Sequence, residues 1–89
     1  MIRRRVVVPN RLGLHARAAA RFVHTASRFR SKVTVSRGEK TMDGKSILGL
    51  LLLAASQGAQ IEIAGDGDDE GPAIEALFAL VESGFGEEA

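Results

Sequence analysis

Residues 32–42 read KVTVSRGEKTM, and this segment predicts the architecture of the whole chain. Its first five residues alternate strictly between polar and apolar side chains, with Val33 and Val35 on one face, as a half-buried strand requires. Residues 37–39 have the composition of a turn, and residues 40–42 can pair back as a short strand. We therefore predict a β-hairpin whose apolar face needs a cover of helices.

The segment before the hairpin predicts a helix. Residues 16–27 are rich in alanine, the best helix former. Apolar residues recur there at i, i+3, i+7 and i+10, which places them on one face. These residues, which we expect to face the core, are Ala16, Ala19, Val23 and Ala26.

The segment after the hairpin predicts a second, shorter helix. Ser46 has the character of an N-cap residue, the apolar run 47–54 follows it, and Gly58 ends the element. We expect one side of this helix to face the core, namely Ile47, Leu50, Leu53 and Ala54. A short helix over a sheet cannot bury all its sides, so Leu48, Leu51 and Leu52 are left on the outer arc.

The remaining elements lie toward the two ends of the chain. Residues 2–8 are a β-rich strand that ends at a Pro-Asn turn, and residues 60–64 alternate again, with Ile61 and Ile63 inward. An acidic loop, 65–71, precedes a last helix that opens at Pro72. Its apolar stripe consists of Ile74, Leu77, Phe78 and Val81. We expect Gly84 to stop this helix and the acidic tail, Glu87 and Glu88, to fray.

The predicted order is β-α-β-β-α-β-α. It indicates an α+β fold, an open-faced β-sandwich in which three helices cover one face of a four-stranded, mostly antiparallel sheet. A chain of 89 residues has room for a single domain, residues 1–89. We expect the protein to be a monomer.

Composition excludes several classes of function. The chain has no cysteine, which excludes disulfides, thiolate nucleophiles and cysteine-based zinc sites. Its longest apolar run, residues 47–55, is far shorter than the roughly 20 residues that cross a bilayer, so we expect no membrane insertion. The N-terminus lacks the apolar core of a secretory signal. Together these features favour the cytoplasm.

Charge is distributed very unevenly. All twelve Lys and Arg residues lie in residues 1–45 against two acids, which gives +10, whereas residues 46–89 hold nine acids and no Lys or Arg, which gives −9. Such asymmetry points to an electrostatic partner, with an anion-binding face in the first half. Alternatively, strands from the two halves lie side by side and the charges offset each other.

His15 is the main candidate for chemistry. It stands at the start of the alanine-rich helix, where the free N–H groups of Ala16, Arg17 and Ala18 and the helix dipole favour an anion. Imidazole is a competent nucleophile near neutral pH, and the Arg17 guanidinium can grip phosphoryl oxygens. These features suit a histidine that accepts a phosphoryl group and passes it on. The alternative is a surface histidine or cap residue with no chemistry.

Two further features suggest contact with other proteins. Ser46 offers an exposed hydroxyl at a helix N-terminus, where an added phosphate would meet the favourable end of the dipole. The alternative is a plain N-cap serine. Leu48, Leu51 and Leu52 would form an apolar partner surface, unless neighbouring loops cover them.

We expect no metal ion and no other cofactor. His15 and His24 are nine residues apart and would point in opposite directions from one helix, so they cannot chelate one metal ion together. Gly44-Lys45-Ser46 has the ending of a phosphate-binding P-loop, but Gly38 lies one residue too far from Gly44.

Two motifs, in order, resemble the HPr family, the phosphocarriers of the bacterial phosphotransferase system. Residues 10–18, NRLGLHARA, resemble the phosphohistidine signature, and residues 45–51, KSILGLL, resemble the signature around the regulatory serine. The resemblance extends through essentially the whole chain in length and element order.

The resemblance implies a cycle of phosphoryl transfer. His15 would accept a phosphoryl group on Nδ1 from enzyme I, which phosphoenolpyruvate charges, and would donate it to enzyme IIA domains. Arg17 and the backbone N–H groups of Ala16 and Arg17 would stabilise that group. The protein would thus be a carrier and not a free-standing enzyme.

The resemblance also implies regulation and docking. Ser46 matches the position that an ATP-dependent HPr kinase/phosphorylase modifies. Ile47, Leu48 and Leu51 match the docking surface of the family, and we add Leu52 from the exposed arc. If the protein belonged to the sugar branch of the system, it would also take part in sugar transport.

One departure from the family pattern leaves the pathway open. Ala18 stands where many sugar-system members carry proline, and residues 15–20 look closer to proteobacterial HPr and to NPr, the carrier of the nitrogen branch. Two other rivals remain. A nucleic-acid-binding module would use Arg3, Arg4, Arg5, Arg11 and Arg17, but the chain has no Tyr or Trp on which bases could stack, and we expect no nucleic-acid partner. A regulatory adaptor would never carry phosphate on His15.

Overall fold

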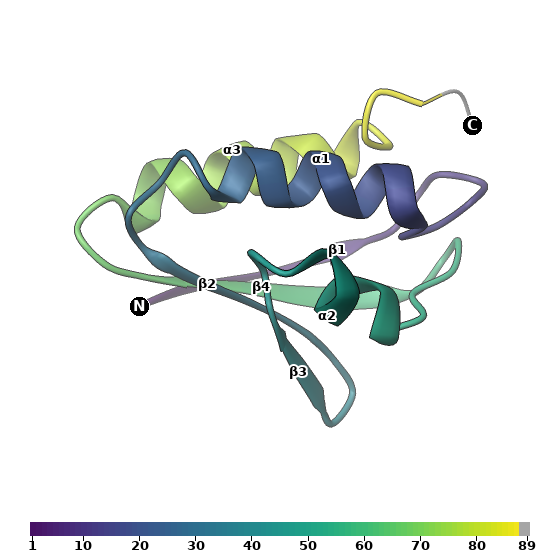
Figure 1. The fold of residues 1–89 in the computed structure, drawn as a ribbon, viewed down its shortest axis with the longest axis horizontal. Coiled ribbons are helices and arrows are strands. Elements are labelled where there is room, and N and C mark those ends of the chain that lie inside the picture. The colour runs from purple at the N-terminus through teal and green to yellow at the C-terminus, as the bar shows by residue number, and fades with distance from the viewer. Residues whose placement is uncertain (88–89) are drawn as a thin grey trace.

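The computed structural model describes residues 1–87 and contains the predicted order of elements within them. Figure 1 shows their arrangement. The strands are β1 (Ile2–Val7), β2 (Lys32–Arg37), β3 (Lys40–Asp43) and β4 (Gln60–Asp66). The helices are α1 (Ala16–Ala26), α2 (Ile47–Leu52) and α3 (Glu70–Glu82). Among these residues no helix has the length and apolar character needed to cross a bilayer.

The strands form one sheet in the order β1-β4-β2-β3, and every pairing is antiparallel. In this register Ile63 of β4 lies opposite Val35 of β2, while Ile61 lies opposite Val6 of β1. The apolar alternation of each strand therefore points to the same side of the sheet, as one buried face requires. The predicted α+β open-faced sandwich is confirmed.

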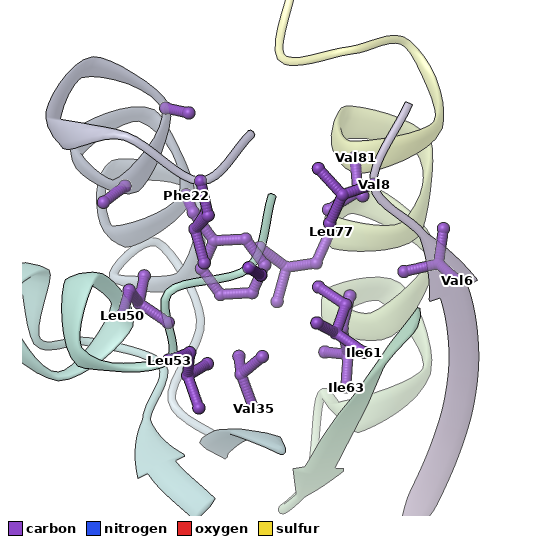
Figure 2. Close-up of a cluster of buried hydrophobic side chains, with 14 of the residues drawn as sticks. Val6, Val8, Phe22, Val35, Leu50, Leu53, Ile61, Ile63, Leu77 and Val81 are labelled. Atoms are coloured by element: carbon purple, nitrogen blue, oxygen red, sulfur yellow. The ribbon is translucent and has the colours of Figure 1, made fainter. Parts of the chain in front are cut away.

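The core lies between this face of the sheet and the helices. Figure 1 shows α1 and α3 side by side across the sheet, with α2 near β3, and α2 packs against both α1 and β3. Figure 2 shows apolar side chains converging from all three helices and from the strands. The largest of those that are almost completely buried include Phe22, Leu50, Leu53, Ile61, Ile63, Leu77 and Phe85.

The helices differ from the prediction in which side chains they bury. In α1, Ala18 and Phe22 are buried and Ala16 is exposed, because the helix packs against both α2 and α3. In α2, Leu50 and Leu53 are buried as predicted. The expectation that Ile47 and Ala54 face the core is wrong: Ile47 is 42% exposed, and Ala54 lies beyond the end of the helix.

The predicted acidic loop is shorter than expected. β4 continues through Asp66 because this strand pairs with β1 and β2 on its two sides, and α3 already begins at Glu70. Pro72 therefore lies in the first turn of α3, where its missing N–H costs no helical hydrogen bond. Only residues 67–69 remain between the two elements.

Asp69, in this connection, ties two loops together. Its carboxylate accepts hydrogen bonds from the Arg30 N–H at 2.9 Å, the Ser31 N–H at 2.9 Å and the Ser31 hydroxyl at 2.5 Å. The hydrogen bond from the Ser31 hydroxyl, followed by the one from the Arg30 amide, lowers the pKa of Asp69 to about 2. The ionised carboxylate is thus the form that the folded protein stabilises.

Replacing Asp69 with asparagine is expected to lower the melting temperature at pH 7 by a few degrees. Because the pKa is lower in the folded state, the contribution of Asp69 is complete above the ordinary carboxyl pKa of 3.8 and is lost as the pH falls to about 2. Thermal unfolding at several pH values should show the difference from the parent protein shrinking over that range. Asp68→Asn is the control, because Asp68 is an exposed neighbour of Asp69. If Asp69→Asn melted at the same temperature as the parent protein at pH 7, the prediction would be contradicted.

Candidate functional site

His15 is the N-cap residue of α1, in agreement with its position in the sequence. The loop before it is held by a hydrogen bond from the Leu14 N–H to the Ala55 carbonyl, at 2.8 Å. Gly13 takes a φ of +67°, and a Cβ at this position would lie 2.5 Å from the Ala55 oxygen. Only glycine fits both demands, so the loop is built to place His15 at the start of the helix.

The His15 ring lies with one nitrogen toward the amino end of α1. Nδ1 accepts a hydrogen bond from the Arg17 N–H at 3.3 Å, and the side chain is 26% exposed. The first N–H groups of a helix have no acceptor within the helix, and they carry the positive end of its dipole. Nδ1 therefore presents a lone pair, open to solvent, beside amides that favour a negative charge.

The Arg17 side chain is exposed, two residues after His15. No carboxylate of residues 1–87 forms an ion pair with it. A guanidinium in this position is available to an incoming anion, and its planar fork matches phosphoryl oxygens. The sequence-predicted residues His15, Ala16 and Arg17 are thus brought together at one helix end.

Glu87 contacts the other nitrogen of His15. Glu87 Oε2 lies 2.5 Å from His15 Nε2, and Oε1 accepts a hydrogen bond from Asn10 Nδ2 at 2.9 Å. The prediction that Glu87 frays is wrong, because its side chain is only 14% exposed and both of its oxygens are engaged. Glu88, the other residue of the predicted frayed tail, lies outside the described residues.

The hydrogen bonds that Glu87 receives keep it ionised. The bond from Asn10 contributes most, followed by the bond and the charge of His15, and together they hold the pKa of Glu87 below its ordinary value. Desolvation acts in the opposite direction and is outweighed. At neutral pH the His15 ring therefore faces a carboxylate on the side away from α1.

Ser46 and the apolar residues after it lie on α2. Ser46 is the N-cap, and its Oγ accepts the Gly49 N–H at 3.0 Å, which confirms its capping role. The exposed side chains of this helix form what we call the α2 patch: Ile47 at 42%, Leu48 at 68%, Leu51 at 37% and Leu52 at 54% exposure. The loops do not cover these leucines, so the alternative that they are hidden is wrong.

The two explanations of the charge asymmetry each describe part of the molecule. β4, from the acidic half, lies between β1 and β2 of the basic half, and Arg5 Nε lies 3.6 Å from Glu62 Oε2. The guanidinium of Arg4 stacks over the Phe78 ring at 3.7 Å. On α1, by contrast, the side chains of Arg17 and Arg21 are exposed. The helix end beside His15 therefore remains basic.

Metal binding has no support in the part of the chain that the structure describes. Within residues 1–87 there is no group of three His, Cys, Asp or Glu side chains that could hold an ion.

Sequence reasoning missed Asn10 and Glu87. They lie 5 and 72 residues from His15, and no local period connects them to it. The one signal was Gly84-Phe85-Gly86, since an aromatic residue between two glycines suits a turn that buries it. That turn carries Glu87 back to His15, at the beginning of α1.

Comparison with known proteins gave consistent matches. The family model described as "PTS HPr component phosphorylation site" matches residues 2–83. "Phosphocarrier protein HPr" of Neisseria meningitidis serogroup A is 46% identical over 87 residues, which cover 98% of each chain. "Phosphocarrier protein NPr" of Shewanella violacea is 42% identical over 86 residues, or 97% of this chain and 94% of the relative. The crystal structure of HPr-C-His from Thermoanaerobacter tengcongensis aligns with a TM-score of 0.96, at 46% identity and 100% coverage of both chains.

Proposed function

Since this chain belongs to the HPr family of phosphocarrier proteins of the phosphotransferase system, we propose that His15 is the residue that carries the phosphoryl group. The family membership confirms the resemblance that the two motifs indicated. The observation that supports His15 is its geometry: Nδ1 lies at the amino end of α1 and accepts the Arg17 N–H, on a side chain that is 26% exposed.

The transfer is a displacement at phosphorus. The Nδ1 lone pair forms a bond to phosphorus while the bond from phosphorus to the donor breaks, and the donor leaves with that electron pair. The phosphoryl oxygens then replace Nδ1 as acceptor for the Arg17 N–H and also accept from the Ala16 N–H, and the Arg17 side chain adds a guanidinium. Donation to the next protein is the same step in reverse, so the site must hold the group without trapping it.

Enzyme I and enzyme IIA domains are the proposed donor and acceptor. Incubation with phosphoenolpyruvate and bacterial enzyme I should add one phosphoryl group, detected by mass spectrometry and lost in mild acid, as expected of a phosphohistidine. Addition of an enzyme IIA domain should remove it. An unlabelled protein in the presence of active enzyme I would overturn the proposal. We further propose that the protein acts as a monomer in the cytoplasm, which light scattering and cell fractionation test.

The nitrogen branch is a second candidate pathway. The match to an NPr, at 42% identity, is close to the match to HPr at 46%. Residues 15–20 resemble both kinds of carrier. In this alternative the protein is a regulatory phosphocarrier that takes no part in sugar uptake. Comparing phosphorylation rates with the enzyme I proteins of the two branches distinguishes them, because the physiological donor should react faster at equal concentration.

The α2 patch is the proposed docking surface for these partners. Its four exposed apolar side chains lie on the helix that packs against α1, and α1 carries His15. Apolar anchors at the centre of a contact provide most of the binding energy, while the basic residues of α1 suit an acidic partner. Phosphorylation of Ser46 by an HPr kinase/phosphorylase would add about −1.5 to −2 charges beside this patch and oppose docking.

Replacing Ser46 with aspartate is expected to weaken binding to enzyme I about tenfold, or about 1.4 kcal/mol. The new carboxylate adds charge beside Ile47 and Leu48, yet it still caps α2, because aspartate is as good an N-cap residue as serine. Isothermal titration calorimetry measures the change. Ser46→Asn keeps the cap and adds no charge, so it should bind like the parent protein; equal weakening by both variants would contradict the charge mechanism.

A further inference from the structure

The segment after α3 is built to hold Glu87 in place. Gly84, Phe85 and Gly86 take φ values of +73°, +59° and +75°, which reverse the chain. The Phe85 side chain is fully buried in the core. Its carbonyl accepts a hydrogen bond from Arg21 Nη1 of α1, and the Glu87 N–H donates to the Gly84 carbonyl at 3.0 Å. The position of Glu87 is thus determined by buried and hydrogen-bonded neighbours.

Asn10, which donates to the other carboxylate oxygen of Glu87, is also held in place. Asn10 is 1% exposed, and its Nδ2 donates to the Gly13 carbonyl at 2.8 Å as well as to Glu87 Oε1 at 2.9 Å. A buried side chain with two such bonds has one orientation. The carboxylate therefore lies between a rigid amide and the His15 ring, with Oε2 directed at Nε2.

The two hydrogen bonds of the His15 ring indicate which of its nitrogens carries the proton. An ionised carboxylate only accepts hydrogen bonds, so Nε2 must carry the proton that lies between it and Glu87. Nδ1 accepts the Arg17 N–H, so Nδ1 must be unprotonated. Both requirements are met by one form of the ring, the neutral tautomer with its lone pair on Nδ1.

We propose that Glu87, anchored by Asn10, is a positioning residue that holds the His15 ring with its Nδ1 lone pair toward the amino end of α1. The consequence for transfer rests on the proposed function of His15. A ring held in this orientation does not have to be ordered during the encounter with a donor. Once Nδ1 is bonded to phosphorus and Nε2 keeps its proton, the ring is positively charged and Glu87 supplies the counter-charge.

A proton NMR experiment tests the contact without any partner protein. The Nε2 proton of His15 should give a downfield resonance that exchanges slowly with water in the parent protein. Glu87→Ala should lose this resonance, whereas Glu82→Ala, which removes an exposed acid at the end of α3, should keep it. Its absence from the parent protein, or its persistence in Glu87→Ala, would overturn the proposal.

Kinetics with phosphorylated enzyme I test the consequence. Glu87→Ala should lower kcat for phosphoryl acceptance by about tenfold to a hundredfold, because the ring must be oriented during the reaction, and should leave KM unchanged, because docking is intact. Glu87→Gln keeps an acceptor for Nε2 and should lose less. A kcat equal to that of the parent protein, or a loss confined to KM, would contradict a positioning role. If the parent protein accepts no phosphoryl group, the proposed function fails, and the NMR result still decides whether Glu87 holds the ring.

Discussion

Replacing His15 with alanine is expected to abolish phosphoryl acceptance from phosphoenolpyruvate and enzyme I. The substitution removes the ring nitrogen whose lone pair accepts the Arg17 N–H at the amino end of α1. The amides and the guanidinium would remain, but they can bind an anion and cannot form a bond to phosphorus. Mass spectrometry after incubation with both reagents should detect no phosphorylated protein.

The matched control for this experiment is His24→Ala. His24 lies on the exposed surface of the same helix, so its removal keeps the fold and leaves the site intact. It should be phosphorylated at the rate of the parent protein. Phosphorylation of His15→Ala to a comparable level would show that another residue accepts the group. It would also revive the adaptor hypothesis, in which His15 carries nothing.

Replacing Phe85 with alanine is expected to lower the free energy of unfolding by about 3–5 kcal/mol, the usual cost of removing a buried aromatic ring. Phe85 is fully buried and belongs to the main core cluster, although it follows the last helix. The loss is a large part of the roughly 5–15 kcal/mol that stabilises a domain of ordinary size. Urea unfolding, followed by circular dichroism, measures it.

Phe29→Ala serves as the comparison for Phe85→Ala. Phe29 is half-buried and lies outside the core cluster, so the same change of side chain should cost clearly less there. A second readout follows from the connection to the site. Loosening the turn should also weaken the hold of Glu87 on His15, and the Nε2 proton should exchange faster. Equal stabilities of the two variants would contradict the role given to Phe85.

Local signals in the sequence predicted most of the fold. The alternation around Val33, Val35, Ile61 and Ile63 identified the buried face of the sheet, and the caps at His15 and Ser46 marked two helix beginnings. These signals operate over a few residues, where the period of a strand and the free N–H groups of a helix end have direct consequences. The residues proposed for the phosphoryl group, Ala16 and Arg17, follow from the same helix end.

The incorrect predictions concern contacts between residues that are far apart in the sequence. Ile47 shares a helical stripe with Leu50 and Leu53, which predicts that it faces the core, but the position of α2 against α1 and β3 decides which side of the helix is covered. For Glu87, no residue nearby in the sequence indicates a partner for its side chain, and the prediction that it frays is wrong. Its partners, Asn10 and His15, are supplied by a turn that depends on the burial of Phe85. Such contacts follow from tertiary packing, which no local pattern encodes.

The most direct test of the central claim identifies the ring nitrogen that carries phosphorus. The protein is labelled with ¹⁵N in its histidines, phosphorylated with phosphoenolpyruvate and enzyme I, and examined by NMR correlation of the ring protons with both ring nitrogens. We expect only His15 to change, with the shift of a nitrogen bonded to phosphorus at Nδ1 and a retained proton at Nε2. A phosphoryl group on Nε2, or on His24, would contradict the account.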